Sequence, residues 1–375
     1  MIKFNKPYLS GKELYYISQA VHAGETSGNK SFTKKCHKFF KDKWGFNHSL
    51  MTTSCTDALE MAAILLNIAP GDEVIAPSYT FVSTVNAFIL RGAKIKFVDS
   101  KIDSPNLDES KLEELITSKT KVIIVVHYAG IACDMDKILD LAKKYELFVV
   151  EDAAQSIDSY YKGKPLGKLG DIGTFSFHET KNIISGEGGM LTVNNLEFIA
   201  RSEIIWEKGT NRSAFFRGQV DKYNWVDIGS SFLPSELIAA FLYAQLENLE
   251  NIQRRRSSIW KLYYEGLKDL ETANMIKLPK IPSYATNNGH MFYIVCNDLT
   301  TRTELIAHLG KNGIKAVFHY LSLHASPYFK DKHDGRDLLN SDIFSTQLLR
   351  LPFYYELTES DIEKVISSIK SFYKL

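Results

Sequence analysis

The sequence predicts an α/β protein built on a mostly parallel sheet. Between Met51 and Glu151, short apolar segments rich in valine and isoleucine alternate with longer amphipathic segments. Strands that alternate with helices in this way form right-handed βαβ units, with helices on both faces of the sheet. The 375 residues, 45% of them hydrophobic, suffice for a substantial core, and a chain of this length forms about two domains.

Apolar spacing places the individual elements along the chain. Two helices, 11–23 and 32–44, precede the alternating region because their apolar residues recur at helical spacing. The alternating region opens with the apolar-to-polar segment MTTSCT at Met51. Further strands are expected at 73–76, 94–98, 122–126 and 148–151, and helices at 57–67, 82–91, 109–117 and 135–145.

Beyond residue 193 the alternation ends, after two more strands at 174–177 and 190–193. A long helical pattern, 234–269, is a natural bridge between two domains, and we place the boundary near Asn248. Residues 1–248 then form an N-terminal arm and a large domain, and 249–375 a smaller α+β domain. The remaining predicted elements are helices at 197–208, 302–312 and 359–373, strands at 291–295 and 315–318, and a polar aromatic loop at 209–227.

Composition narrows the functional classes. Lysine plus arginine (45) nearly equals aspartate plus glutamate (44), so no overall field favours nucleic acid or an anionic membrane as a partner. The four cysteines show neither CxxC pairing nor a histidine at metal-ligand spacing, so we expect no metal site and no disulfide. The apolar runs are too short to cross a bilayer, and we expect a cytoplasmic protein.

Lys181 is the first candidate for chemistry. It lies in a polar turn between an apolar strand and the Gly-Glu-Gly-Gly cluster at 186–189, whose glycines let the backbone approach a ligand closely. A lysine on such a scaffold can form a Schiff base with a carbonyl-bearing cofactor, because burial or a neighbouring charge keeps its amine nucleophilic. On this stretch alone, a solvated surface lysine is the commoner interpretation.

Other strand ends carry polar or aromatic side chains, and open α/β sheets bind ligands there. The segment 52–57 (TTSCTD) presents hydroxyls at a helix N-terminus, which suits a phosphate or an ordinary N-cap. Asp152 ends a buried strand and needs a partner, either a protonated pyridine nitrogen, a helix N-terminus or a structural cation. Residues 77–81 (PSYTF) offer an aromatic ring for stacking or for the core.

The combination of these features indicates a function far more specifically than any one of them does. It consists of the possible phosphate site at 52–57 (the phosphate cup), an aromatic ring, Asp152, Ser176 and Lys181. They predict a pyridoxal phosphate site, in which the lysine holds the aldehyde and the aspartate keeps the ring nitrogen protonated. The strings EDAAQ (151–155), FSFHETKN (175–182) and GEGG (186–189) resemble the DegT/StrS family of pyridoxal-phosphate sugar aminotransferases. The resemblance runs over essentially the whole chain, from FNKPYLSGKE to LRLPFYYELT.

This resemblance implies the fold-type I architecture of aspartate aminotransferase, pyridoxal 5'-phosphate as cofactor, and a homodimer with shared active sites. By motif, Lys181 matches the Schiff-base lysine, Asp152 the partner of the pyridine nitrogen, and Gln155 a residue near the cofactor's hydroxyl. His319 and Tyr320 are expected to line the sugar-nucleotide pocket, with a structural histidine as an equal alternative. The expected phosphate and ring contacts are Thr56, Asp57, Ser176 and Phe81.

Three positions depart from the family's pattern. Cys55 stands where many members have glycine, and Ser322 where members tend to have proline. Leu233 stands where many have an asparagine that reaches the phosphate from the partner subunit. Which residue of the partner subunit contacts the phosphate is therefore open. Either Ser230 or Ser231 makes this contact, or the alignment to the family is shifted in this segment.

The implied reaction transfers an amino group from L-glutamate to C4 of dTDP-4-dehydro-6-deoxy-D-glucose, giving a dTDP-4-amino-4,6-dideoxyhexose for polysaccharide biosynthesis. Amination at C3 of a dTDP-3-keto sugar is an alternative. A sugar dehydratase of the same family would typically have histidine in place of Lys181. The intact lysine, aspartate and phosphate cup disfavour a non-catalytic scaffold, and no GxGxxG follows the first strand, which disfavours a Rossmann oxidoreductase.

Overall fold

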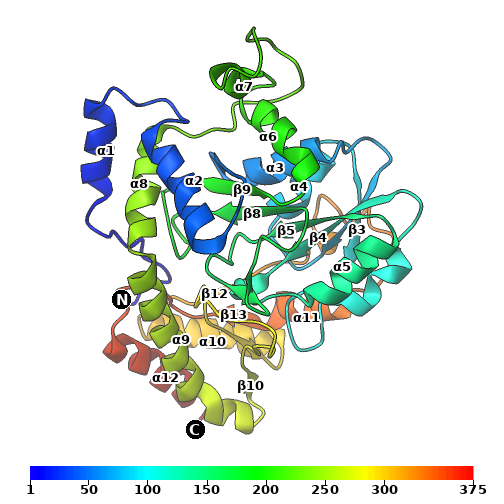
Figure 1. Cartoon of the computed structure of the whole chain (residues 1–375). Helices are drawn as coiled ribbons and strands as arrows, with labels where there is room; N and C mark the ends of the chain where they lie inside the picture. The colour runs from blue at the N-terminus through cyan, green and yellow to red at the C-terminus, as the bar shows by residue number, and fades with distance from the viewer. Residues whose placement is uncertain (375) are drawn as a thin grey trace.

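The computed structural model describes residues 1–374, whose larger sheet has seven strands (Figure 1). They are β1 (Ser49–Thr52), β2 (Glu73–Pro77), β3 (Lys94–Val98), β4 (Thr120–Val126), β5 (Phe148–Asp152), β8 (Ile172–Ser176) and β9 (Gly189–Val193). Their order is β1-β9-β8-β5-β4-β2-β3. Only β9 runs against the others, because it pairs antiparallel with both β1 and β8 while the remaining neighbours pair parallel. The predicted mixed, mostly parallel sheet is confirmed.

Helices cover both faces of this sheet because alternate strand residues enter different cores. In β4, Val122 and Ile124 pack into one core, and Ile123 and Val125 into another. The first core contains α3 (Cys55–Leu65), α4 (Ser83–Ile89) and α6 (Ile199–Trp206). The opposite face is covered by α5 (Met135–Lys144), α2 (Ser31–Trp44) and α8 (Glu236–Glu247), and α1 (Glu13–His22) packs on α8.

A second sheet and its own core occupy the lower half of the molecule in Figure 1. Ile2 packs into this core and pairs with Ile314, so the start of the chain lies beside its C-terminal part. The boundary predicted near Asn248 falls between α8 and α9 and stays a prediction. The elements are β10 (Ile276–Lys277), β11 (Tyr293–Cys296), β12 (Val317–Phe318) and β13 (Leu348–Arg350), with α9 (Leu249–Thr272), α10 (Leu299–Lys311), α11 (Leu339–Gln347) and α12 (Glu359–Tyr373).

Some predicted elements are wrong. The helix expected at 109–117 consists of two 3₁₀ turns, Glu109–Lys111 and Glu113–Leu115, because Leu112 and Leu115 are buried three residues apart, the repeat of a 3₁₀ helix. The pattern at 234–269 is two helices, since the chain turns at Asn248 from α8, which packs on the opposite face of the larger sheet, to α9, most of which packs in the core of the second sheet.

Several short elements were not predicted, because they contain too few residues for a periodic pattern. The loop at 209–227 contains a short helix, α7 (Arg212–Phe216), and both α11 and β13 were missed. A hairpin of β6 (Tyr160–Tyr161) and β7 (Lys164–Pro165) forms a third, two-stranded sheet. Within residues 1–374, no helix has the length and apolar character needed to span a membrane.

Gly189, the first residue of β9, lets this strand pass directly against the start of α3. A Cβ atom at this position would lie 2.4 Å from the carbonyl oxygen of Ser54 and 2.6 Å from the backbone nitrogen of Cys55. Both are backbone atoms at the beginning of a helix, which cannot move without shifting α3. The glycine therefore fixes the distance between the sheet and the N-terminus of α3.

We expect Gly189→Ala to destabilise the protein by about 1–3 kcal/mol, the usual cost of inserting a methyl group into a packed site. Equilibrium denaturation by urea measures this change. Gly310→Ala is the matched control, because an added Cβ there meets no atom within 4 Å and the residue lies inside α10. The control is expected to be neutral or to stabilise by up to about 1 kcal/mol. Equal stability of the two variants would contradict the packing argument.

Candidate active site

The strand directions bring the predicted site residues to one edge of the larger sheet. Asp152 is the last residue of β5 and lies opposite Thr174 of β8, while Ser176, the last residue of β8, lies opposite Gly189. Gly189 in turn lies opposite Thr52, the last residue of β1. The carboxyl ends of three parallel strands and the start of the reversed strand therefore meet at this edge.

A cavity of about 590 Å³ opens at this edge. Residues of the second sheet and of the N-terminal segment also line it, so it lies where the two cores meet. Asp57 is the one predicted site residue that does not line the cavity. The predicted residues in its lining are Thr56, Phe81, Asp152, Gln155, Ser176, Lys181, His319 and Tyr320.

The N-terminus of α3 is capped as the simpler alternative for this segment predicts. The Ser54 hydroxyl accepts a hydrogen bond from the backbone N–H of Asp57 at 3.1 Å, and the Asp57 carboxylate accepts one from the Thr53 hydroxyl. Asp57 is therefore engaged within the helix start. Thr56 lines the cavity and donates its hydroxyl to Ser83 at 2.8 Å. The cup thus presents Thr56 and the first backbone N–H groups of α3 to the cavity, an arrangement suited to an anion.

Lys181 enters the cavity from the turn after β8. Its backbone N–H donates to the carbonyl of His178 at 2.9 Å, which closes the turn. Burial lowers the pKa of the Lys181 ammonium, and the nearby Cys55 and Asp152 act in the opposite direction without cancelling this effect. A buried amine with a lowered pKa is nucleophilic nearer to neutral pH than a surface lysine.

Asp152 is almost fully buried, with 6% of its surface exposed. One carboxylate oxygen accepts the Thr84 hydroxyl at 2.7 Å and the other accepts the backbone N–H of Ala154 at 3.2 Å. Burial raises the pKa of Asp152, although these two donors and the Lys181 charge each lower it. Two neutral donors do not compensate a buried charge, so the carboxylate has capacity for a cationic partner in the cavity.

The residue before it, Glu151, points to the other side of the strand and is fully enclosed. Its carboxylate accepts backbone N–H groups of Gly167, Leu169 and Gly170 at 2.6–2.8 Å. It also lies 3.0 Å from Nε2 of His127. Four donors hold Glu151 and, with it, the end of β5 that carries the aspartate.

His127 has a defined tautomer in this arrangement. The backbone N–H of Cys133 donates to Nδ1 of His127 at 3.2 Å, so Nδ1 is an acceptor and Nε2 carries the proton that it donates to Glu151. Sequence reasoning did not single out either residue. The available signal in the sequence was the pair of consecutive acidic residues in EDAAQ, which directly follows the apolar run of a predicted strand.

Four further predicted residues lie near one another in the lining of the cavity: Phe81, Gln155, His319 and Tyr320. Gln155 accepts the backbone N–H of Ala129 at 2.6 Å and donates to the Tyr320 hydroxyl at 3.2 Å. Nδ1 of His319 lies 3.0 Å from the Tyr128 hydroxyl. Burial lowers the pKa of His319 well below its usual value, and Arg350 and Lys181 add to this effect, so the imidazole is neutral. Phe81 is 55% exposed at the cavity, with its ring centroid 6.1 Å from that of Tyr320.

Two cavity residues from the second core were missed by sequence reasoning: His290 and Arg350. Asn182 donates its amide nitrogen to Gln253 and to the carbonyl of Asn288, so its amide oxygen is the acceptor that faces Nδ1 of His290 at 2.8 Å. His290 therefore donates from Nδ1, which leaves Nε2 as an acceptor nitrogen. Burial lowers the pKa of His290 well below its ordinary value.

The loop before α8 carries Leu233, Ser230 and Ser231, and which of them contacts the partner's phosphate stays open. Leu233 is partly buried against the first core, and its side chain lies close to Gly28. Ser230 and Ser231 are exposed, and none of the three lines the cavity. The Ser230 carbonyl accepts a hydrogen bond from the backbone N–H of Lys208, and the Ser230 N–H donates one to the carbonyl of Ile205. These two bonds hold this segment beside α6.

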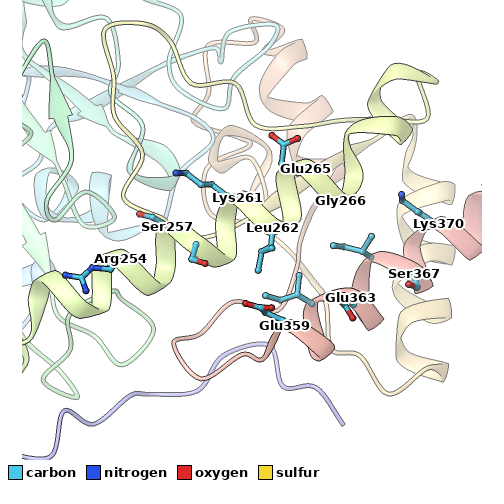
Figure 2. A pocket seen from close by; sticks show the side chains of 13 residues that line it. Arg254, Ser257, Lys261, Leu262, Glu265, Gly266, Glu359, Glu363, Ser367 and Lys370 are labelled. Carbon is cyan, nitrogen blue, oxygen red and sulfur yellow. The ribbon is translucent and has the colours of Figure 1, made fainter.

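A separate groove of about 860 Å³ runs between α9 and α12 (Figure 2). Gly266 allows this close approach, because an added Cβ would lie 2.4 Å from Cδ1 of Ile366. In Figure 2, Leu262 points from α9 toward α12. None of the predicted site residues lines this groove, so the smaller cavity at the sheet edge is the candidate active site.

A cavity at the strand ends of a mostly parallel sheet, with a partly buried lysine and a buried aspartate, is typical of fold-type I pyridoxal-phosphate enzymes. Comparison with known proteins supports this class. The chain belongs to the DegT/DnrJ/EryC1/StrS aminotransferase family, which it matches over residues 8–370. It is therefore a pyridoxal-phosphate-dependent aminotransferase, as the sequence motifs predict.

Proteins with a named activity align with nearly the whole of this chain. The GDP-perosamine synthase of Caulobacter vibrioides is 34% identical over 370 residues, 97% of this chain and 96% of the relative. The UDP-4-amino-4-deoxy-L-arabinose–oxoglutarate aminotransferase of Shewanella sediminis is 32% identical, with 97% and 96% covered. A Streptococcus pneumoniae structure described as a sugar aminotransferase in its PLP form aligns with a TM-score of 0.90 and 25% identity, over 100% of this chain and 98% of that one.

The residues of the cavity fit this cofactor. The Asp152 carboxylate has capacity for a cation, which a protonated pyridine nitrogen provides. Lys181 lines the same cavity with a buried amine, and the N-terminus of α3 offers Thr56 and backbone N–H groups to a phosphate. A carbonyl, a ring nitrogen and a phosphate thus each find a chemically matched group.

Lys181→Met is expected to make the cofactor-free protein more stable at neutral pH. Because burial lowers the pKa of Lys181 below its unfolded value near 10.5, the charged lysine opposes folding at every pH below its folded pKa. This penalty decreases as the pH rises from the folded pKa to the unfolded one. We expect a gain on the order of 1 kcal/mol at pH 7, typical of relieving a destabilised functional group.

Thermal unfolding of the cofactor-free proteins at pH 7 and near pH 10 measures this gain. Lys119→Met, at an exposed position, is the control and is expected to change little at either pH. A Lys181→Met protein that is no more stable than the wild type at pH 7, or a gain that grows toward alkaline pH, would contradict the assigned sign.

Proposed function

We propose that this aminotransferase moves the amino group of L-glutamate to C4 of dTDP-4-dehydro-6-deoxy-D-glucose, giving a dTDP-4-amino-4,6-dideoxyhexose. The observation that carries the reaction type is the presence of the partly buried Lys181 and the buried Asp152 in one cavity at the sheet edge. The choice of a dTDP-linked sugar as substrate rests on the resemblance of the motifs, and of the whole chain, to the family. The relatives named for GDP-linked and UDP-linked amino sugars support a nucleotide-linked substrate.

In this proposal the large sheet holds the cofactor. Thr56, Ser176 and the N-terminus of α3 bind the phosphate, Asp152 the pyridine nitrogen, and Phe81 lies against the ring. Bound pyridoxal phosphate supplies an aldehyde that takes up amino groups and a protonated ring that withdraws electrons. Thr84 and the backbone N–H of Ala154 keep the Asp152 carboxylate oriented toward the cavity.

Lys181 then acts as the base and acid of the reaction. Its amine removes the proton from the α-carbon of L-glutamate and returns a proton to C4 of the sugar in the second half-reaction. A single group that serves both directions implies ping-pong kinetics. Its lowered pKa favours the neutral amine that proton removal requires. His319 and Tyr320 lie across the cavity, where we place the sugar.

We also propose a homodimer that shares its active sites. Exposed apolar side chains on the loop around α7 support this assembly, among them Phe216, which is 71% exposed, and Trp225, which is 82% exposed. Large apolar groups gathered on one loop typically mark an interaction surface. Ser230 and Ser231 adjoin this loop, and we keep them as candidates for the phosphate contact from the partner. The cytoplasmic location expected from the sequence belongs to the same proposal.

The substrate assignment is tested by supplying the protein with pyridoxal phosphate, L-glutamate and one of three 4-keto sugars linked to dTDP, GDP or UDP. We expect the dTDP-sugar to have a kcat/KM at least about tenfold higher than the others, which corresponds to ~1.4 kcal/mol of discrimination. NMR of the product should place nitrogen on C4. Lys181→Ala should form no product; turnover at the wild-type rate, a GDP or UDP preference, or nitrogen on C3 would contradict the proposal.

Asp152→Asn is expected to fold and to catalyse poorly. Asparagine keeps groups of the same size beside Thr84 and Ala154 but does not carry the negative charge that holds the ring nitrogen protonated. We expect kcat to fall by about 10²-fold or more, the scale of losing one electrostatic contact in an active site. Circular dichroism checks the fold and stopped-flow absorbance the reaction with L-glutamate. An unchanged kcat would refute the role of Asp152 in keeping the ring nitrogen of the cofactor protonated.

A further inference from the structure

His290 brings to the cavity an acceptor nitrogen that the reaction proposed above does not use. Its Nδ1 donates to the amide oxygen of Asn182, so Nε2 carries a lone pair that accepts hydrogen bonds. Within residues 1–374, no group forms a hydrogen bond with this Nε2 atom. The side chain is 8% exposed and lines the same cavity as Lys181. An imidazole with one unpartnered acceptor nitrogen at a cavity is a site for an N–H or O–H donor.

A buried polar network sets the orientation of this imidazole. The amide nitrogen of Asn182 donates to Gln253 and to the carbonyl of Asn288, both at 2.9 Å, so its oxygen is the acceptor. Asn288 also accepts the backbone N–H of His290 at 3.0 Å, and Arg256 donates to the carbonyl of His290 at 2.7 Å. The backbone and the ring of His290 are both held by hydrogen bonds, so Nε2 has a defined position.

The same network connects the imidazole to Lys181. Asn182 directly follows Lys181 in the chain, and the backbone N–H of Lys181 closes the turn on the carbonyl of His178 at 2.9 Å. His290 is therefore hydrogen-bonded to the residue next to the lysine, in a chain where consecutive Cα atoms are only ~3.8 Å apart. The acceptor nitrogen and the base of the lysine side chain share one support.

The lysine amine is the donor that this arrangement fits. Within the part of the chain that the structure describes, the Lys181 ammonium has no hydrogen bond and no ion pair. Its nitrogen and Nε2 of His290 are not bonded to each other in this structure, and the flexible four-carbon side chain of lysine allows them to meet. An unpartnered donor and an unpartnered acceptor thus line one cavity.

The charges around the cavity keep this imidazole neutral. Burial lowers the pKa of His290 well below its ordinary value, and the cations Lys181, Arg256 and Arg350 lower it further. Nε2 therefore keeps its lone pair at neutral pH and accepts a hydrogen bond without taking up the proton. A group that must keep its own proton can be held by such an acceptor.

We propose that His290 is a positioning residue for Lys181, whose amine donates a hydrogen bond to Nε2 while it acts as base and acid. The inference rests on the proposed transamination. A neutral amine has two N–H groups and one lone pair, and one N–H held by Nε2 fixes the direction of the lone pair. The ammonium formed when the amine takes the α-proton keeps the same bond. The proton stays on Lys181 until it is returned to the sugar.

Two substitutions keep opposite halves of the imidazole and make the test specific. His290→Asn retains a donor to Asn182 at the Nδ1 position but has no acceptor at the Nε2 position. His290→Gln places an amide oxygen near the Nε2 position but gives up the bond to Asn182. A purely structural role of His290 predicts that the asparagine variant works better, whereas our proposal predicts that the glutamine variant does.

Stopped-flow absorbance of the pyridoxal-phosphate-bound protein with L-glutamate measures the first half-reaction. We expect His290→Asn to slow it by about 10- to 100-fold, the scale of a misplaced catalytic group, and His290→Gln by less than about fivefold. With α-deuterated L-glutamate, the isotope effect should be larger in the asparagine variant than in the wild type, because removal of the α-proton becomes slower relative to binding.

Nitrogen-15 NMR of the imidazole provides a readout without turnover. In the protein loaded with pyridoxamine phosphate, which leaves the lysine amine free, we expect the Nε2 signal of His290 to be that of a hydrogen-bonded acceptor. In Lys181→Met, loaded in the same way, this signal should shift to that of a nitrogen without a donor. This comparison leaves His290 intact, so it decides the question even if the His290 variants fold poorly.

His308→Asn is the matched control. His308 is a partly buried histidine of α10 whose Nε2 lies 3.1 Å from the carbonyl of Ser368, and it does not line the cavity. The substitution removes a hydrogen bond of the same kind away from the site, so the rate with L-glutamate should stay within about twofold of the wild type. Thermal unfolding and visible absorbance of the bound cofactor verify that each variant is folded and loaded.

Several outcomes overturn the inference. If His290→Asn reacts with L-glutamate at the wild-type rate, or if His290→Gln is the slower variant, His290 does not position the lysine. If only the half-reaction with the nucleotide sugar slows, Nε2 accepts from the sugar instead. An Nε2 signal that is the same with and without the lysine amine also contradicts the proposal. A wild-type protein that transfers no amino group refutes the proposed function, and the NMR comparison still decides whether amine and imidazole are bonded.

Discussion

Two consecutive buried carboxylates at the end of β5 are balanced in opposite ways, and the site depends on this difference. Glu151 is satisfied entirely by the protein, through three backbone N–H groups and His127. Asp152 faces the other side of the strand and receives only the Thr84 hydroxyl and one backbone N–H. The protein thus rigidly holds the strand end while leaving one charge to be completed by a ligand, at a cost in stability before the ligand binds.

The large sheet and most of its site could be predicted because each strand carries its own hydrophobic run and each run ends in a recognisable polar group. Asp152, Ser176 and Lys181 line the cavity as expected, since the strand directions bring their ends to one edge. Asp57 shows the limit of this reasoning. A Ser/Thr/Asp segment at a helix start satisfies its own backbone as readily as it binds a ligand, and here Asp57 is taken up by the cap.

His290 and Arg350 could not be predicted in the same way. Both come from the second core, where short antiparallel strands of two to four residues give no periodic signal, and β13 itself was missed. Arg350 stands in an apolar string, LLRLPF, where a cation between leucines suggests burial but does not say what it faces. Only the register of β13 between β11 and β12 directs it to the cavity.

The two cores therefore contribute different kinds of group to one cavity. The larger sheet and its loops supply Asp152, Ser176, Lys181 and the start of α3, which suit pyridoxal phosphate. The second sheet and its flanking loops supply His290, His319, Tyr320 and Arg350. In the proposed function, groups near the second sheet contact the substrates, and substitutions there would change substrate choice without disturbing the groups that hold the cofactor. This proposed division agrees with the names of two relatives, 32% and 34% identical to this chain, which refer to amino sugars on different nucleotides.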